Sequence, residues 1–256
     1  MKKLLLVIFV ITFSIANSIE KKTVIVGVYP FSPYVNYDPP MTGITIDFIK
    51  LLNETQDEFL FVAKDISPRR RYEMMKNKNI DIMIFEDTMW EWSGKNVGFS
   101  NQFVINGIPF HDGELYVALK EKTQNQSYFN NLKDKKLLIT HGYHYSFANF
   151  NSDEAFLKSN FNVDICLDPE GVIKKLLKYR GDIGLIDKAL LNRYIKNNPQ
   201  DKDKFFVSKK LDAEYHFVFI VGNHSPITKK QINMLISKLE KNGKLDAFFK
   251  KNYLIE

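Results

Sequence analysis

The sequence has only one cysteine, Cys166, among 256 residues. A single cysteine excludes an intramolecular disulfide, so the fold must be stabilised by its hydrophobic core alone. Cys166 stands between two apolar residues, Ile165 and Leu167. We therefore predict a small buried side chain at this position and not a reactive thiol.

The short motifs of several enzyme classes are also missing. The sequence contains no Gly-x-Ser-x-Gly, no His-Glu-x-x-His, no phosphate-binding glycine loop and no dinucleotide fingerprint. His141 and His144 are close together, but the sequence offers no third metal ligand near them. These absences argue against several kinds of enzyme, and we expect neither a cofactor nor a metal ion.

A hydrophobic run of membrane-spanning length is missing too, although the chain begins with a shorter one. Residues 1–3 are Met-Lys-Lys, residues 4–15 are almost continuously apolar, and Ala-Asn-Ser follows at residues 16–18. A membrane-spanning helix needs about 20 apolar residues. We therefore predict a signal peptide over residues 1–18 and export to the periplasm. An uncleaved membrane anchor is the alternative.

Positive charge is in slight excess but is concentrated in only one place. The net charge is +6, and most of it comes from lysines scattered among Asn and Asp, which is typical of a solvated surface and not of a nucleic-acid-binding stripe. The exception is three consecutive arginines at residues 69–71, where a helix is expected to begin and a cation opposes the helix dipole. A guanidinium binds carboxylate or phosphate with two hydrogen bonds. We predict that one of the three, first of all Arg70, reaches a ligand; a solvated or locally ion-paired cluster is the alternative.

Two segments far apart in the sequence share one layout. They are residues 73–86 and residues 175–187. Each reads as the end of an amphipathic helix, a turn with an aspartate (Asp81, Asp182), and a short apolar strand that ends in a carboxylate (Glu86, Asp187). Ligands bind at the carboxyl ends of such strands in α/β sheets. We therefore predict that Glu86 and Asp187 lie near the floors of two facing sites, and that Asp81 and Asp182 are structural.

Aromatic residues are gathered in the loops beside these strands. Tyr29, Phe31 and Tyr34 follow the first predicted strand, Trp90 follows Glu86, and Tyr143 follows a later strand. Loops of this kind often carry binding residues. We predict that Tyr29, Phe31 and Trp90 form apolar walls around a ligand and that Tyr143 contacts it. Packing within the protein is the alternative for each of them.

The order of the predicted elements indicates an α/β fold, because strands and helices alternate along the chain. Apolar strands near residues 110–119 and 215–221 are expected to cross between two lobes. The lobes are therefore predicted to be discontinuous, with residues 19–110 and 217–256 in the first and residues 111–216 in the second.

The mature sequence resembles the family 3 periplasmic solute-binding proteins of bacterial transport systems along nearly its whole length. The resemblance rests on the order and spacing of short segments at residues 26–30, 43–47, 80–83, 112–116, 132–136, 181–182 and 239–245. It implies a two-lobed type II periplasmic-binding-protein fold whose lobes are joined by two crossing strands and close on a small solute. It also implies a monomer that serves a membrane permease complex.

The resemblance further implies two ligand-binding residues, of which the sequence has one. Asp187 matches the aspartate that holds the ligand's amino group. The arginine that usually follows the first-lobe strand is absent from residues 86–93, and Glu86 stands where a small residue is common. Either Arg70 supplies the missing carboxylate clamp or the ligand lacks a carboxylate. Two acids with aromatic walls would suit a cationic ligand, such as a basic amino acid or a polyamine.

We therefore expect an exported solute-binding protein that captures an amino acid or a related small polar solute for an ABC transporter. Two other functions stay open. One is a periplasmic enzyme that resembles cyclohexadienyl dehydratases, with Glu86 or Asp187 as the acid. The other is a ligand-sensing module that presents its closed form to a membrane receptor.

Overall fold

The structure is a computed structural model that describes residues 20–37, 39–92, 103–104, 112–123 and 125–252. The predicted signal peptide, residues 1–18, lies outside the described residues. Of the helices in the described part of the chain, none has both the length and the apolar character needed to cross a lipid bilayer.

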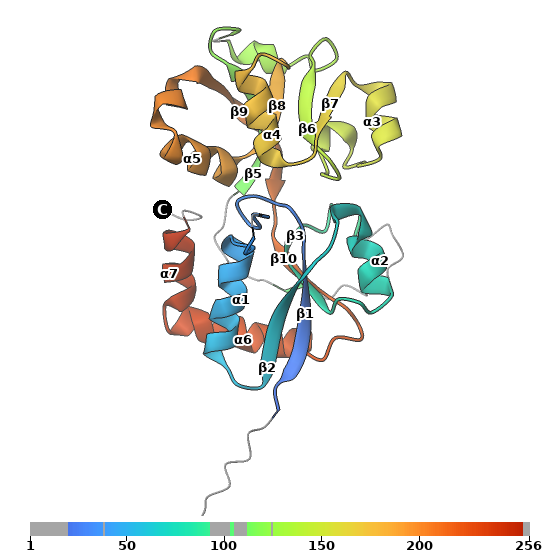
Figure 1. The fold of residues 1–256 in the computed structure, drawn as a ribbon, viewed down its shortest axis with the longest axis vertical. Coiled ribbons are helices and arrows are strands. Elements are labelled where there is room, and N and C mark those ends of the chain that lie inside the picture. The colour runs from blue at the N-terminus through green and yellow to red at the C-terminus, as the bar shows by residue number, and fades with distance from the viewer. Residues whose placement is uncertain (1–19, 38, 93–102, 105–111, 124, 253–256) are drawn as a thin grey trace, which may run out of the picture.

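The described strands form two five-stranded mixed sheets, one above the other in Figure 1. The first sheet has the order β2-β1-β3-β10-β4 and the second the order β7-β6-β8-β5-β9. The first sheet consists of β1 (Lys22–Val28), β2 (Phe59–Asp65), β3 (Ile82–Glu86), β4 (Phe103–Val104) and β10 (Val218–Val221). The second consists of β5 (Asp112–Leu119), β6 (Leu137–Thr140), β7 (Val163–Cys166), β8 (Ile183–Asp187) and β9 (Phe205–Tyr215). In both sheets three parallel strands are followed by an antiparallel one, so the two halves repeat one topology.

Helices pack on both sheets, as the alternating pattern predicts (Figure 1). The first half has α1 (Ile44–Thr55), the 3₁₀ turn η1 (Pro68–Arg70), α2 (Arg71–Lys76), α6 (Lys229–Lys241) and α7 (Lys244–Lys251). The second half has η2 (Gln126–Phe129), η3 (Ser146–Ala148), α3 (Glu154–Asn160), α4 (Pro169–Leu177), α5 (Lys188–Asn197) and η4 (Pro199–Lys204). The ring of Phe48 in α1 lies 6.1 Å from Phe219 of β10 and 5.1 Å from Phe248 of α7. These contacts fix α1 and α7 on one face of the first sheet.

The repeated sequence layout forms equivalent structures in the two halves. β3 and β8 are buried along their whole lengths, because both faces of each strand are covered, and this explains their continuous apolar runs. Asp81 precedes β3 and accepts a hydrogen bond from the backbone of Ile25 at 2.7 Å. Asp182 precedes β8 and accepts one from the backbone of Lys136 at 2.8 Å. The predicted structural role of both aspartates is therefore confirmed.

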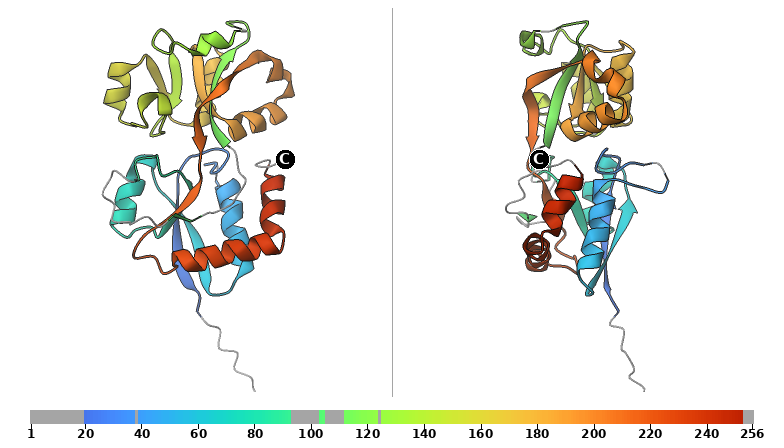
Figure 2. Two further views of the ribbon diagram at one scale, coloured as in Figure 1. Left: turned by 180° about the vertical axis from the view of Figure 1, so that it is seen from behind. Right: turned by 90° about the vertical axis from the view of Figure 1, so that its left-hand side faces the viewer.

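The chain passes directly from one half to the other after β9. β9 belongs to the second sheet and β10 to the first, and only residues 216–217 separate them (Figure 2). The other predicted crossing falls partly on residues 105–111, which lie outside the described residues. The two-lobed α/β fold is thus confirmed, while the proposed lobe boundaries at residues 110–111 and 216–217 stay a prediction.

The hydrophobic core is continuous between the two halves. One cluster extends from the first sheet through Phe31 and Trp90 to Tyr143 and Tyr215 of the second half. A smaller cluster lies under α4 and α5 and contains Cys166, which is buried as predicted. Burial also raises the pKa of this thiol, which disfavours the reactive thiolate.

Candidate binding pocket between the two halves

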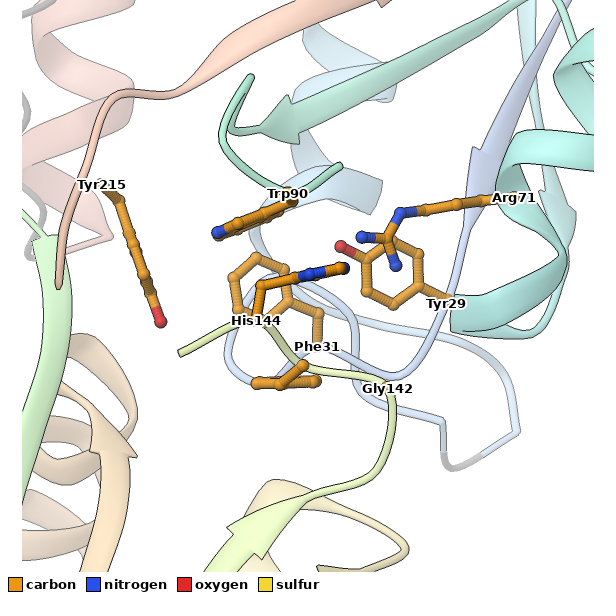
Figure 3. Close-up of a pocket in the computed structure, with 8 residues that line it drawn as sticks. Tyr29, Phe31, Arg71, Trp90, Gly142, His144 and Tyr215 are labelled. Atoms are coloured by element: carbon orange, nitrogen blue, oxygen red, sulfur yellow. The ribbon is translucent and has the colours of Figure 1, made fainter. Parts of the chain in front are cut away.

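A small pocket lies where the two halves meet, with an empty volume of about 250 Å³ (Figure 3). Both halves contribute to its wall. The lining residues are Tyr29, Phe31, Arg71 and Trp90 from the first half, and Gly142, Tyr143, His144 and Tyr215 from the second. The wall is therefore mostly aromatic, with one permanently charged side chain.

The loop after β1 supplies the aromatic floor of the pocket. Phe31 stacks on Tyr34 with ring centroids 4.6 Å apart, and its ring meets Tyr143 of the other half edge-on at 5.5 Å. The loop is held in shape by two backbone hydrogen bonds between Phe31 and Val35, of 3.1 and 2.8 Å. Phe31 is thus fixed by its own half and contacted by the other.

Trp90 and Tyr215 close the opposite side of the pocket. Their rings pack edge-to-face with centroids 5.3 Å apart, and Figure 3 shows Tyr215 entering from the side away from Arg71. The backbone carbonyl of Trp90 accepts a hydrogen bond from the hydroxyl of Tyr72 at 2.6 Å. Trp90 is therefore anchored to α2 while its ring contacts β9.

Arg71 is a buried cation at the pocket wall, with an exposed fraction of 1%. Its Nη1 donates to the backbone carbonyl of Pro68 at 2.8 Å, and its Nε lies 3.4 Å from Oε2 of Glu86. The guanidinium also lies over the rings of Tyr29, Tyr72 and Trp92, at 5.0, 4.6 and 5.8 Å from their centroids. Arg71 is thus held by one carboxylate and an aromatic cage.

The two members of this pair respond differently to burial. Burial raises the pKa of Glu86, while Arg71 and the indole N–H of Trp92, which donates to Oε2 at 2.6 Å, oppose that shift. Burial lowers the pKa of Arg71, but Glu86 together with Tyr29, Tyr72 and Glu91 outweighs it and the net pKa is raised. The raised pKa of Glu86 favours the neutral acid, whereas the raised pKa of Arg71 favours the ion pair. We favour the ion pair, because two donors face the same carboxylate oxygen.

A tight turn after β6 forms the wall from the second half. Gly142 has φ +72°, and a Cβ at this position would lie 3.1 Å from the Cβ of Pro68 in the first half. A side chain here would need both a left-handed backbone and extra space between the halves. Gly142 therefore permits the close approach that closes the pocket.

His144 makes two hydrogen-bonding contacts, one to the first half and one within its own half. Its Nε2 lies 3.0 Å from the hydroxyl of Tyr72 in the first half, and its Nδ1 lies 2.7 Å from the carbonyl of Phe150. A carbonyl can only accept, so Nδ1 carries a proton. The Oε2 of Glu91 is 3.9 Å from the same nitrogen.

Asp187 lies outside this pocket wall. It caps α5, where its Oδ1 accepts the backbone N–H of Leu190 at 3.0 Å. The side chain is buried beside Asp112 and Glu114, and burial and these two acids raise its pKa well above the usual range. Asp187 therefore does not face the space between Arg71 and Tyr215 in this form of the protein.

The predicted site residues divide into three groups. Those that line the pocket are Tyr29, Phe31, Trp90 and Tyr143. Glu86 lies behind the wall, paired with Arg71, and Asp187 lies elsewhere. Arg70 is exposed and does not line the pocket, whereas its neighbour Arg71 does, so a ligand contact of Arg70 stays a prediction. Arg70 ends the 3₁₀ turn, whereas Arg71 begins α2 on the buried side that also carries Tyr72 and Met75.

Two contributors were not foreseen from the sequence. Tyr215 was interpreted only as part of a crossing strand, although a strand that joins two lobes has to pass their junction. Tyr72 lies in the helix expected to begin at residues 69–71, and nothing in the sequence singles it out. In the described part of the chain, no group of three or more His, Cys, Asp or Glu side chains could hold a metal ion.

Comparison with solved structures shows the same two-lobed fold in many amino-acid-binding proteins. A mutant of the arginine-binding protein ArgBP from T. maritima is 16% identical with a TM-score of 0.64, covering 90% of this chain and 95% of that one. The GluR0 ligand-binding core from Nostoc punctiforme, solved with L-glutamate, is 18% identical with a TM-score of 0.66, covering 91% and 100%. An ancestral amino-acid-binding protein described as a precursor of cyclohexadienyl dehydratase is 14% identical with a TM-score of 0.64, covering 90% and 94%. At these identities the likeness concerns the fold.

Sequence comparison adds little. No family model matches the chain. Chaperone protein HtpG of Buchnera aphidicola subsp. Baizongia pistaciae (strain Bp) is 25% identical over 126 residues, which is 46% of this chain and 20% of HtpG. This chain thus spans about a fifth of that relative.

Proposed function

We propose that this protein is an exported solute-binding protein that captures a small carboxylate-bearing solute, an amino acid or a related compound, by closing its two halves. The observation that carries this proposal is the buried guanidinium of Arg71 in a pocket built from both halves. The fold shared with amino-acid-binding proteins supports it.

Arg71 is suited to hold an anionic group. It is the one permanent charge among the pocket-lining residues, and it lies where the two halves meet. Glu86 and the aromatic cage fix the guanidinium in place before a ligand arrives. A fixed guanidinium binds a carboxylate through two charge-assisted hydrogen bonds with little loss of side-chain entropy.

The pocket favours an anionic over a cationic ligand group. Glu86 is already paired with Arg71, and neither Glu86 nor Asp187 lines the pocket in this form. A cation placed here would face Arg71 without a free carboxylate in contact. The idea of a polyamine or another ligand without a carboxylate is therefore not what we propose. A contact between Asp187 and the amino group of a ligand stays a prediction.

The size and walls of the pocket point to a small ligand. Its empty volume is about 250 Å³, part of which is open to solvent, so only a small ligand would fit between these walls. Contacts across the halves, such as Tyr72 with His144 at 3.0 Å and Tyr143 with the carbonyl of Pro30 at 3.4 Å, belong to a closed form. A ligand would stabilise this form by binding it more tightly than an open one.

Export and delivery to a membrane permease are part of the proposal. The layout of residues 1–18 supports export, and a soluble receptor that closes on its ligand can present that closed form to a permease or to a sensory receptor. A dehydratase-like activity is less well supported, because Glu86 and Asp187 do not reach the pocket in this form.

The test is a ligand screen by thermal shift and calorimetry on the chain from residue 19 onward. The panel would contain neutral, acidic and basic amino acids, the same amines without a carboxylate, polyamines, and prephenate or arogenate. A ligand at about 100 times its dissociation constant adds about 2.7 kcal/mol to the free energy of unfolding. Binding only to compounds with a carboxylate is the expected result, and binding only to amines without one would overturn the proposal.

The role of Arg71 needs a charge-balanced variant. Replacing both Arg71→Met and Glu86→Gln removes the guanidinium without leaving a buried carboxylate unpaired. We expect solute affinity to fall by about 30-fold or more, because a desolvated charge pair contributes about 2 kcal/mol or more. Arg70→Met is the matched control one residue away, and it should bind like the wild type. Unchanged affinity of the double variant would exclude Arg71 as the anchor.

A further inference from the structure

Three carboxyl groups are buried together at the junction of β5, β8 and α5. Asp112, Glu114 and Asp187 have exposed fractions of only 3%, 2% and 2%. Glu114 stands directly opposite Asp187 in the antiparallel pair of β5 and β8. Asp112 accepts the backbone N–H of Ala189 at 3.2 Å, and Asp187 accepts that of Leu190 at 3.0 Å. Asp112 and Asp187 therefore meet at the first turn of one helix.

No cation balances these groups among the residues that the structure describes. Within that part of the chain, no Lys, Arg or His nitrogen lies within 4.0 Å of the three carboxyls. Their side-chain donors are hydroxyls: Tyr34 donates to Asp112 and Tyr215 donates to Glu114. The N-terminus of a helix offsets only about half an elementary charge. Three ionised carboxylates would thus repel one another with little compensation.

The hydrogen bonds of Asp187 indicate where a proton resides. Its Oδ2 is buried and receives no hydrogen bond from a conventional donor in the described residues. The neighbouring group is the carboxyl of Asp112, and two carboxyls can bond to each other only when one of them carries a proton. A proton shared between Asp112 and Asp187 would satisfy both groups.

The directions of the pKa shifts agree with this geometry. Burial raises the pKa of Glu114 to about 8, and it also raises the pKa of Asp112 and Asp187. Among the described residues, the other titratable groups that act on this cluster are tyrosines and one more acid, and none of these adds positive charge. They are Tyr34, Tyr143, Tyr145, Asp212 and Tyr215.

The cluster is sealed by groups from both halves. Tyr34 belongs to the loop after β1 and packs on Phe85 of the first sheet at 5.3 Å between ring centroids, while its hydroxyl bonds to Asp112 at the start of β5. Tyr215 seals Glu114 and also contacts Trp90 of the first half at 5.3 Å. Separation of the halves would remove these contacts and let water reach the carboxyls.

We propose that closure of the two halves is coupled to proton uptake by Asp112, Glu114 and Asp187. The closed form keeps these groups partly protonated, and the open form hydrates and releases the protons. This inference rests on the closure described under the proposed function, but it requires no solute. Since the closed form binds more protons, lower pH favours closure and higher pH favours opening.

The test measures the radius of gyration of the solute-free protein by small-angle X-ray scattering between pH 5.5 and 9.5. It uses a His144→Gln background, so that the imidazole at the junction cannot contribute. We expect a compact form at low pH and expansion as the pH rises through about 8. A radius that does not change with pH would overturn the inference.

Variants locate the protons. Asp187→Asn keeps the cap on α5 and lets the amide donate to Asp112, so its expansion at high pH should be smaller. Glu114→Gln is a second, independent variant with the same expectation. Asp182→Asn, a carboxylate paired with Lys122 at 2.9 Å, is the matched control and should expand like the wild type. If both cluster variants expand like the wild type, the protons do not reside here.

The two proposals can fail separately. A screen without a bound solute would leave the pH-dependent expansion unaffected. A pH-independent radius together with a carboxylate-specific ligand would retain the solute-binding function and remove only the proton coupling.

Discussion

The carboxyl ends of β3 and β8 carry corresponding acids in two copies of one motif, but their surroundings differ. Glu86 at the end of β3 faces a guanidinium, 3.4 Å away, and the indole N–H of Trp92. Asp187 at the end of β8 faces the N-terminus of α5 and two further carboxyls. One half balances its buried acid with a cation, and the other with backbone dipoles and protons.

This difference shows that position in a fold does not determine the charge state of a group. Both acids are almost fully buried, so water solvates neither of them. The partners decide the outcome, because a buried carboxylate stays ionised only where a cation or several donors face it. We therefore expect the free energy of unfolding to fall when a charge is removed from the first half. We expect the contribution of the second half to depend on pH.

The largest expected effect on stability follows from removal of the buried cation of the first half. Arg71→Met should lower the free energy of unfolding by about 3–5 kcal/mol, because Glu86 would be left as an unpaired buried charge. Urea denaturation monitored by circular dichroism measures this. Adding Glu86→Gln should restore a good part of the loss, and Arg70→Met should change stability by less than about 0.5 kcal/mol. Equal losses for Arg70→Met and Arg71→Met would contradict the assigned ion pair.

The next effect concerns the pH dependence of the second half. The pKa of Glu114 is about 8 in the folded protein and about 4.5 when unfolded, so the folded state binds more protons between these values. Stability contributed by this group is therefore present below about pH 4.5 and lost as the pH rises towards 8, by up to about 1.4 kcal/mol per pH unit.

Glu114→Gln tests this directly. The amide cannot ionise, so the free energy of unfolding should fall less between pH 5.5 and 8.5 than it does in the wild type. Urea denaturation at several pH values measures how the free energy of unfolding changes with pH. Asp182→Asn is the control and should show the same pH dependence as the wild type. A slope that is the same in Glu114→Gln and the wild type would show that Glu114 does not titrate in this range.

The smallest effect concerns the distance between the halves. Gly142 and Gly243 both have left-handed backbones, with φ +72° and +70°, but a Cβ at Gly142 would touch Pro68 whereas one at Gly243 would meet nothing within 4 Å. Both Gly→Ala variants should lose about 1 kcal/mol of stability through the backbone. Only Gly142→Ala should also weaken solute binding, by several-fold in calorimetry. Equal affinities in the two variants would indicate that this turn is not part of the closing surface.

Much of the fold could be predicted from the sequence, because it depends on local patterns. The alternation of strands and helices and the turns at Asp81 and Asp182 are local features, and the structure has them. The placement of Tyr29, Phe31 and Trp90 beside strand ends could also be predicted from the sequence. These features depend on neighbours within a few residues.

Features that depend on distant partners could not be read in the same way. The sequence could not show that Arg71 and not Arg70 lines the pocket, because η1 turns by about 120° per residue and α2 by about 100°, so the boundary between them decides which arginine faces inward. The charge state of Asp187 depends on Asp112, a residue 75 positions away that touches it only after the sheet has formed. Periodicity in a sequence carries no information about such contacts.

The two tryptophans of the chain give closure an optical signal. Trp90 packs against Tyr215 of the other half, whereas Trp92 is held within its own half by a 2.6 Å hydrogen bond to Glu86. Separation of the halves would change the surroundings of one indole and leave the other as an internal reference. Intrinsic fluorescence, with Trp90→Phe as the silent variant, should therefore report opening and closing without any attached dye.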